Sequence, residues 1–251
     1  MKILLSSHFF HPSVGGIEQV SLTLAREFVK AGHEVKVVTT TERESGEEFP
    51  FEVARRPGSG KLCALVGWCD VFFHNNISLQ TAWPLVFTRR PWVVAHHTWL
   101  TRINGATGIR DRIKQRVIRR ATNIAVSRAV AEHLSMPSTV IGNPYNDALF
   151  KTNGAGARTG DLVFVGRLVW DKGVDLLISA VSALKNRDVQ ARLTVVGDGP
   201  EREMLERQVM ALELKDRVEF AGMRTGEELV ALLNAHRVMV VPSRWKEPSG
   251  L

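Results

Sequence analysis

The sequence predicts an α/β protein that contains two successive Rossmann-like domains, the second of them incomplete. Strand-like and helix-like segments alternate along the chain, and this alternation is typical of parallel βαβ units. A polar, glycine-rich run over 143–160 separates two such series. Glycines and charged residues follow several predicted strands, and the loops after parallel strands gather at one edge of a sheet. We therefore expect the functional residues at such an edge.

The first series begins with a strand and its clearest helix. The helix is predicted over 16–31, because apolar residues recur at helical spacing and Gly32 follows as a C-cap. The apolar stripe consists of Ile17, Val20, Leu24, Phe28 and Ala31. Strands of this series are predicted near 2–7, 34–39, 50–54, 70–73, 91–96, 122–126 and 138–141.

The second series holds four predicted strands, near 161–165, 192–196, 217–220 and 237–241. Helices are predicted between them, near 173–186, 200–213 and 226–235. A doubly wound nucleotide-binding domain normally has about six strands. We therefore assign 1–148 to a first domain, 149–160 to a linker, and 161–251 to a partial second domain.

Composition narrows the class of protein. Of the 251 residues, 44% are hydrophobic and 24% charged, which is typical of a globular protein. The two cysteines, Cys63 and Cys69, have no zinc-site spacing, which favours a reducing compartment. No apolar stretch approaches the roughly 18 residues of a membrane span. We expect a cytoplasmic protein.

Positive charge is concentrated in the first domain. The net charge is +7, and the first 150 residues account for +6 of it. Six cations lie close together: Arg110, Arg112, Lys114, Arg116, Arg119 and Arg120. Such a cluster favours an anionic partner, such as the inner face of a membrane, to which the protein would bind peripherally. A solvated helix face is the alternative, because charge runs often mean only that.

Four short segments of the second half combine glycines with charge. They are Gly166-Arg167-Leu168, Lys172-Gly173, Gly197-Asp198-Gly199-Pro200 and Glu247-Pro248-Ser249-Gly250-Leu251. Glycine lets backbone N–H groups approach phosphate oxygens, and helix N-termini add positive potential. Arg167 and Lys172 supply full positive charges. The segments predict a diphosphate site.

With Gly15-Gly16-Ile17-Glu18 after the first strand, these motifs resemble the GT-B retaining glycosyltransferases of family 4. The resemblance covers the whole chain. It implies two Rossmann-like domains facing across a cleft, the first holding a lipid-linked or saccharide acceptor and the second a nucleoside-diphosphate sugar. It implies no cofactor, no metal and no nucleic-acid partner, and its commonest setting is surface polysaccharide or lipopolysaccharide assembly.

The resemblance also implies roles for individual residues. Arg167 and Lys172 match the cations that stabilise the leaving diphosphate, and His97 matches a histidine near the donor sugar and the acceptor. Glu247 matches the first acid of an E-x7-E motif, which contacts sugar hydroxyls. The other donor-binding positions are Gly15, Gly16, Gly166, Gly197, Asp198, Gly199, Gly250 and Leu251.

The sequence departs from the family pattern at its end. The second glutamate of E-x7-E belongs at position 255, beyond Leu251. The sequence therefore predicts a C-terminally truncated chain whose own transfer activity is impaired.

Several alternatives remain open at this stage. A non-catalytic remnant or binding module fits the absence of position 255, and a nicotinamide-dependent oxidoreductase fits two Rossmann-like domains. The oxidoreductase is disfavoured, because no G-x-G-x-x-G follows the first strand. A metal site is disfavoured by the spacing of the histidines, and a nucleoside triphosphatase by the lack of Ser or Thr after Lys61.

Overall fold

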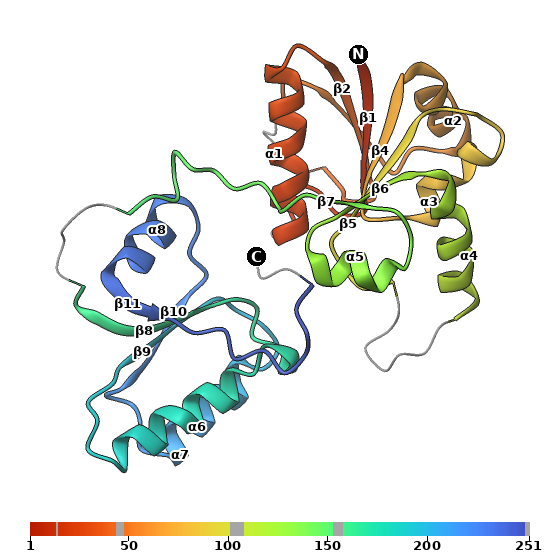
Figure 1. The fold of residues 1–251 in the computed structure, drawn as a ribbon. Coiled ribbons are helices and arrows are strands. Elements are labelled where there is room, and N and C mark those ends of the chain that lie inside the picture. The colour runs from red at the N-terminus through yellow and green to blue at the C-terminus, as the bar shows by residue number, and fades with distance from the viewer. Residues whose placement is uncertain (14, 44–47, 101–107, 153–157, 249–251) are drawn as a thin grey trace. The chain divides into compact units, whose positions relative to one another are not determined.

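The computed structural model describes residues 1–13, 15–43, 48–100, 108–152 and 158–248 (Figure 1). The chain divides into two compact units. The first consists of Met1–Tyr145 with Pro248–Leu251, and the second of Asn146–Glu247. The run that the sequence assigns to a linker, 149–160, is thus counted in the second unit, where Asn234 Nδ2 donates a hydrogen bond to Lys151 O at 3.1 Å.

The first unit is built on a seven-stranded sheet in which all strands are parallel. Its strands are β1 (Lys2–Ser7), β2 (Glu34–Thr39), β3 (Glu52–Arg55), β4 (Val71–Asn75), β5 (Trp92–His96), β6 (Thr122–Ala125) and β7 (Thr139–Val140). Their order is β3-β2-β1-β4-β5-β6-β7. The order reverses between β1 and β4, and ligands of doubly wound sheets bind beyond the carboxyl ends of the strands at such a point.

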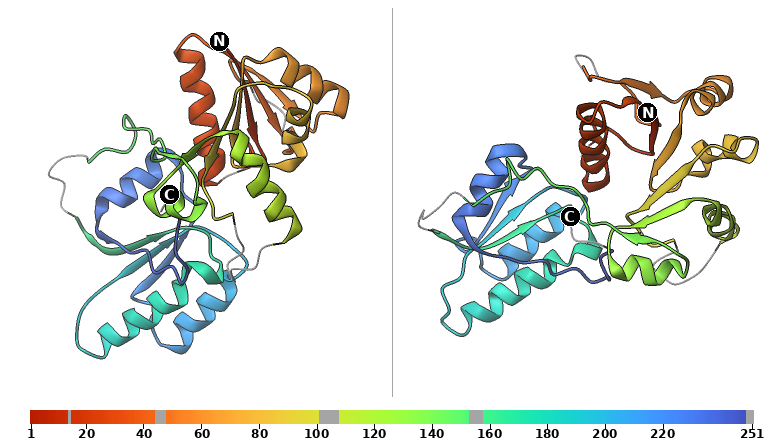
Figure 2. Two further views of the ribbon diagram at one scale, coloured as in Figure 1. Left: turned by 45° about the vertical axis from the view of Figure 1, so that its right-hand side comes forward. Right: turned by 45° about the horizontal axis from the view of Figure 1, so that its top comes forward.

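Helices cover both faces of this sheet. They are α1 (Gly16–Lys30), α2 (Ser59–Trp68), α3 (Leu79–Ala82), α4 (Ile109–Val117) and α5 (Arg128–Leu134), with 3-10 helices η1 (Trp83–Val86) and η2 (Ile118–Arg120). Successive strand residues point to opposite faces. Leu5 therefore packs in one core with Leu22 of α1, while Leu4 packs in the other with Val66 of α2. In Figure 2 the red helix α1 and the orange helix α2 lie on opposite sides of the sheet.

The second unit contains a four-stranded parallel sheet in the order β10-β9-β8-β11. Its strands are β8 (Gly160–Val165), β9 (Leu193–Val196), β10 (Val218–Gly222) and β11 (His236–Met239). Its helices are η3 (Trp170–Lys172), α6 (Val174–Lys185), α7 (Arg202–Ala211) and α8 (Gly226–Ala235). Residues of α6 and α7 pack with β9 in one core, whereas the edge strand β11 leaves Val238 and Met239 about half exposed.

The α/β class with parallel sheets, predicted from the sequence, is confirmed by both units. Strand boundaries differ from the prediction by at most two residues, as at β3, predicted near 50–54, and the last strand of the first sheet shrinks from 138–141 to the two exposed residues Thr139–Val140. The helix predicted from 173 begins one residue later, because Gly173 adopts a left-handed conformation with φ +68°. In the part of the chain that the structure describes, no helix has the length and apolar character needed to cross a membrane.

Candidate donor-binding site and buried histidines

The loops at the carboxyl edge of the second sheet are tied together by backbone hydrogen bonds. Leu168 N, after β8, donates to Asp198 O, after β9, at 2.9 Å. Glu201 N at the start of α7 donates back to Leu168 O at 3.1 Å. Arg244 N, after β11, donates to Asp171 O at 2.9 Å. Three of the four glycine-containing motifs therefore occupy one edge of one sheet.

Two glycines make this close approach of loops feasible. Gly197 has φ +133°, and a β-carbon on it would lie 1.9 Å from Gly166 O. Gly173 has φ +68°, and a β-carbon there would lie 2.2 Å from Pro242 O. Both obstacles are backbone atoms that cannot swing aside, so only glycine fits at either position.

The structure brings Lys172 and Glu247 into direct contact. Lys172 Nζ donates to Glu247 Oε1 at 2.6 Å, and Ser243 Oγ donates to the same oxygen at 2.6 Å. Burial tends to raise the pKa of the Glu247 carboxyl, but the hydrogen bonds and the positive charge of Lys172 outweigh it, and the pKa lies below its usual value. Glu247 is therefore ionised at neutral pH and accepts hydrogen bonds only.

The other charged residues of this edge differ in their partners. Arg167 is exposed and forms no ion pair with any described residue. Asp198 Oδ1 accepts from Gly199 N at 2.7 Å, and its Oδ2 lies 3.6 Å from Arg202 Nη1. Arg167 is thus available to an anion, whereas Asp198 already stabilises its own turn. Gly250 and Leu251 lie outside the described residues.

In the first unit, Gly15 and Gly16 stand at the N-terminus of α1. Gly15 is the extended N-cap, and no side chain caps the helix by a hydrogen bond. A β-carbon on Gly15 would lie 2.3 Å from Glu18 Oε2, so the carboxylate of Glu18 lies beside the first turn. A carboxylate is favourable there because helix N-termini carry positive potential.

His97 follows β5 and is buried, with 6% of its surface exposed. Its Nε2 lies 2.5 Å from Asn75 Oδ1, and its backbone N–H donates to Asn76 Oδ1 at 2.9 Å. Burial lowers the pKa of His97 to about 4; a hydrogen bond with Asn143 opposes this fall, and the neighbouring His96 adds to it. The ring is neutral at pH 7 and acts through hydrogen bonds rather than through charge.

The other buried histidines of this unit each have protein partners. His74 Nδ1 accepts from Trp92 Nε1–H at 2.8 Å, and its Nε2 lies 3.0 Å from Thr81 Oγ1. His96 Nε2 donates to Asn123 Oδ1 at 2.8 Å. Among the residues that the structure describes, no group of three or more His, Cys, Asp or Glu side chains gathers as metal ligands would.

The cationic cluster lies on α4 and η2. Five of its six side chains are exposed, Lys114 is half-buried, and none pairs with a carboxylate of the described chain. Two apolar residues of α4 are also exposed, Ile109 at 78% and Ile113 at 45%. Residues four apart share one face of a helix. This pair was not predicted from the sequence, although two isoleucines four residues apart within a basic run indicate such a face.

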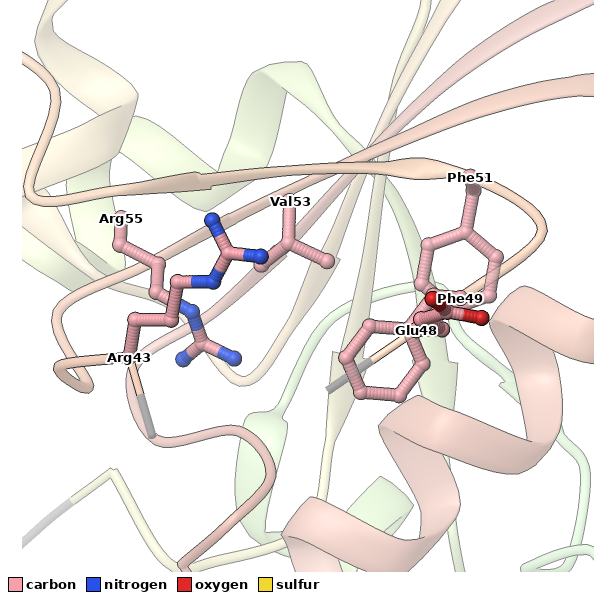
Figure 3. Close-up of a pocket in the computed structure, with 6 residues that line it drawn as sticks. All are labelled: Arg43, Glu48, Phe49, Phe51, Val53 and Arg55. Atoms are coloured by element: carbon pink, nitrogen blue, oxygen red, sulfur yellow. The ribbon is translucent and has the colours of Figure 1, made fainter. Parts of the chain in front are cut away.

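A pocket of the first unit was also missed from the sequence (Figure 3). It is lined by Arg43, Glu48, Phe49, Phe51, Val53 and Arg55. The rings of Phe49 and Phe51 stack with their centroids 5.3 Å apart, and Arg55 Nη2 donates to His11 O at 2.9 Å. Alternate residues of an extended segment share one side, so the spacing of the last four lining residues predicts a common surface.

Two family matches divide the chain close to the boundary between its structural units. The family described as Glycosyltransferase Family 4 matches residues 14–147, more than half of the chain, and the family described as Glycosyl transferases group 1 matches residues 146–251. The chain belongs to Glycosyltransferase Family 4. Family membership favours a sugar transferase over the nicotinamide-dependent oxidoreductase, and it confirms the resemblance found in the motifs.

Known proteins are similar to parts of this chain or to its fold. Alpha-D-kanosaminyltransferase of Streptomyces kanamyceticus is 34% identical over 86 residues, which are 34% of this chain and 22% of that enzyme. The chain spans less than a third of the length of the curated relatives that it matches at 34–36% identity.

Two solved structures show the GT-B fold. TarM of S. aureus, solved with UDP and alpha-GlcNAc-glycerol, has a TM-score of 0.76 at 10% identity, and the match covers 99% of this chain and 82% of that one. WaaG, a glycosyltransferase involved in lipopolysaccharide biosynthesis, has a TM-score of 0.66 at 17% identity, covering 96% of this chain and 75% of that one. The predicted GT-B fold class is therefore confirmed.

Proposed function

We propose that this chain acts as a glycosyltransferase that moves a sugar from a nucleoside-diphosphate sugar to an acceptor, with retention of the anomeric configuration. The observation that carries the proposal is the contact between Lys172 and Glu247 at the carboxyl edge of a parallel sheet, the edge that also carries the exposed Arg167. A site with two cations and one ionised carboxylate suits a ligand that is anionic at one end and rich in hydroxyls at the other. A nucleoside-diphosphate sugar is such a ligand, because its diphosphate is anionic and its sugar carries the hydroxyls.

In the proposed reaction, the bond between the sugar C1 and the diphosphate oxygen breaks as the oxygen of an acceptor hydroxyl bonds to C1 from the same face, and the hydroxyl proton passes to the departing diphosphate oxygen. The diphosphate then carries the electron pair of the broken bond. Arg167 and Lys172 stabilise this developing negative charge, and preorganised charges of this kind are usually the largest contribution to catalysis. Glu247 accepts hydrogen bonds from sugar hydroxyls and so orients the ring.

The donor would also separate the ion pair between Lys172 and Glu247. Lys172 and Glu247 are each about one-quarter exposed or less, at 25% and 19% of their side-chain surface. Binding of the donor exchanges one partly buried pair for two new sets of contacts, diphosphate with Lys172 and hydroxyls with Glu247. The ion pair keeps both side chains in place until then.

For His97 we propose a hydrogen bond to a hydroxyl of the donor sugar or of the acceptor. The ring is neutral at physiological pH, since burial lowers its pKa to about 4. A neutral imidazole orients a hydroxyl without adding charge to the site. Gly15 and Gly16 would present N–H groups of α1 to the diphosphate.

The acceptor that we propose is a saccharide or a lipid-linked saccharide of surface polysaccharide or lipopolysaccharide assembly, with no cofactor and no nucleic-acid partner. The involvement of WaaG in lipopolysaccharide biosynthesis supports this setting, as do the cations of α4. The first unit would bind peripherally to the inner face of an anionic membrane, with the exposed Ile109 and Ile113 entering the interface.

The experiment is titration calorimetry of the chain with UDP, GDP and their hexose derivatives, followed by an assay for transfer or slow donor hydrolysis. We expect binding of a nucleoside diphosphate and release of a sugar whose first-formed anomer, read by proton NMR, matches that of the donor. Binding without turnover would favour a non-catalytic binding module. No binding at millimolar concentration would contradict the proposal, and an inverted product would contradict retention.

A further inference from the structure

A buried chain of hydrogen bonds connects His97 with the loop after β1. His97 Nε2 lies 2.5 Å from Asn75 Oδ1, and Asn75 Nδ2 lies 2.6 Å from Ser21 Oγ. Ser21 Oγ lies 2.7 Å from Ser7 Oγ, which lies 2.6 Å from Phe9 O. The side chains of Ser7, Ser21 and Asn75 are at most 1% exposed. The chain therefore joins β1, α1, β4 and the end of β5 around the point where the strand order reverses.

The direction of the hydrogen bonds in this network follows from which atoms can donate. Phe9 O is a carbonyl and only accepts, so Ser7 donates its proton there and its oxygen accepts from Ser21. The Ser21 hydroxyl has one proton, and its Oγ lies 2.7 Å from Ser7 Oγ and 2.9 Å from Ile17 O. Whichever of these two oxygens receives the proton, Ser21 Oγ accepts from Asn75. Asn75 must therefore direct its amide nitrogen toward Ser21.

A second contact sets the same orientation of the Asn75 amide. Asn75 Nδ2 donates to Ile17 O at 3.1 Å, and a flipped amide would place two oxygens against each other there. The oxygen Oδ1 consequently faces His97. Because an amide oxygen only accepts, the proton between them must lie on Nε2 of His97.

We propose that Asn75 is a positioning residue that holds His97 as its Nε2–H tautomer and leaves Nδ1 as the nitrogen with a lone pair. The inference rests on the proposed function, because it states how His97 meets a hydroxyl: the hydroxyl takes the place of Asn143, which also hydrogen-bonds to His97, and donates a hydrogen bond to Nδ1 while Nε2–H stays bound to Asn75. Asn75 also donates hydrogen bonds to Ile17 and Ser21 in the first turns of α1. One hydrogen-bond network therefore holds both the His97 ring and the start of α1, where Gly15 lies.

The nearby His96 and Asn123 provide a matched control. His96 Nε2 donates to Asn123 Oδ1 at 2.8 Å, and Asn123 Nδ2 donates to the carbonyls of Ile118 and Ala121 at 3.0 and 3.1 Å. The two pairs share the same chemistry on adjacent histidines. Only the Asn75 pair belongs to the network that reaches α1.

The test is long-range proton–nitrogen NMR of the chain labelled with nitrogen-15 in its histidines, with His97 assigned through His97→Gln. We expect the Nε2–H tautomer at pH 7. Asn75→Ala should give a mixture of tautomers at His97 and leave His96 unchanged, whereas Asn123→Ala should do the reverse. Asn75→Asp keeps the accepting oxygen and should restore the Nε2–H tautomer with a higher pKa.

Turnover supplies an independent readout. Asn75→Ala should lower kcat about ten- to a hundredfold with little change in the donor KM, because an imidazole in the wrong tautomer cannot accept at Nδ1. If Asn75→Ala does not fold, Ser21→Ala can be used instead. It removes the hydroxyl that accepts a hydrogen bond from Asn75, and it should broaden the nitrogen signals of His97. An Nδ1–H tautomer in the unmodified chain, or an unchanged His97 signal in both variants, would overturn the inference. Full transfer by His97→Gln would instead refute only the role of His97 in the proposed function.

Discussion

Lys172 and Glu247 lie 75 residues apart in the sequence, yet their side chains meet at 2.6 Å and form a partly buried ion pair. Ser243 donates to the same carboxylate oxygen and holds it in place. Each charge is compensated by the other within the second unit. A donor must therefore compete with Glu247 for Lys172, and this competition makes the pair testable.

Glu247→Gln removes the negative charge and keeps the shape of the side chain. We expect the affinity for a nucleoside diphosphate without sugar to rise about two- to tenfold, because Lys172 no longer pairs with a carboxylate. The extra affinity that a hexose adds should fall, because an amide holds the sugar hydroxyls less strongly than a carboxylate. Calorimetry with both ligands measures the two effects. Ser243→Ala is the control, since it removes a hydrogen bond but no charge, and equal losses for both ligands in Glu247→Gln would contradict this account.

Arg167→Ala and Lys172→Ala should each reduce transfer about a hundredfold or more, by analogy with the loss of one preorganised donor at a developing anion. The thermal unfolding midpoint should change little for the exposed Arg167. Arg187→Ala is the matched control: this exposed arginine follows the far end of the 12-residue helix α6, about 18 Å along its axis. Transfer that falls equally in Arg187→Ala would mean that net charge, not the site, is responsible.

Gly197→Ala should destabilise the second unit by about 2–4 kcal/mol, because its β-carbon would meet Gly166 O at 1.9 Å and its φ is +133°. Gly222→Ala separates the effect of the positive φ from the effect of the close contact. Gly222 also has a positive φ, +70°, but no atom lies within 4 Å of its β-carbon position. We expect it to cost about 1 kcal/mol in urea unfolding. Equal losses in the two variants would show that the contact between the loops is not close.

The stability of the first unit should fall as the solution is acidified. Burial lowers the pKa of His74 to about 3, against an ordinary value of 6.5, so between these values the unfolded chain binds a proton that the folded chain does not. Folding stability is therefore lost as pH falls below about 6.5. From pH 7 to pH 5 the loss is about 2 kcal/mol for His74 alone.

Urea unfolding of the unmodified chain and of His74→Gln at the two pH values measures this dependence. The variant should be less stable at pH 7, because it loses packing against Trp92 and Thr81, but its stability should depend less on pH by about 2 kcal/mol. The burial of His96 and His97 lowers their pKa values too and accounts for the dependence that remains. An identical pH dependence in both proteins would exclude His74 as its source.

The first unit should sediment with anionic vesicles and detach as salt is added, because each cation near such a surface contributes about 1 kcal/mol. Replacing Ile109 and Ile113 by serine should weaken binding about tenfold or more, since both side chains would leave the lipid interface. Ile141→Ser is the control, an isoleucine of similar exposure outside α4. Equal sedimentation with neutral and anionic vesicles at low salt would show that the cations of α4 face only solvent.

The order of the strands and helices could be predicted from the sequence, because their signals are local. The apolar stripe of α1 has helical spacing, and the strand after Gly32 was predicted with the bounds that the structure has, Glu34–Thr39. The candidate residues at the ends of β8 and β9 could be named for the same reason. A loop after a strand of a parallel sheet has only one edge at which to lie.

Contacts between distant segments were decided by the tertiary structure alone. Asn75 was not a candidate in the sequence, because its role depends on His97 and Ser21, which reach it only when β1, β4 and β5 pair side by side. Local spacing carries no information on which buried polar groups will satisfy one another. The same holds for Lys172 and Glu247: the sequence supplied two opposite charges, and the pairing of β8 with β11 brings the loops that carry them to the same edge of the sheet.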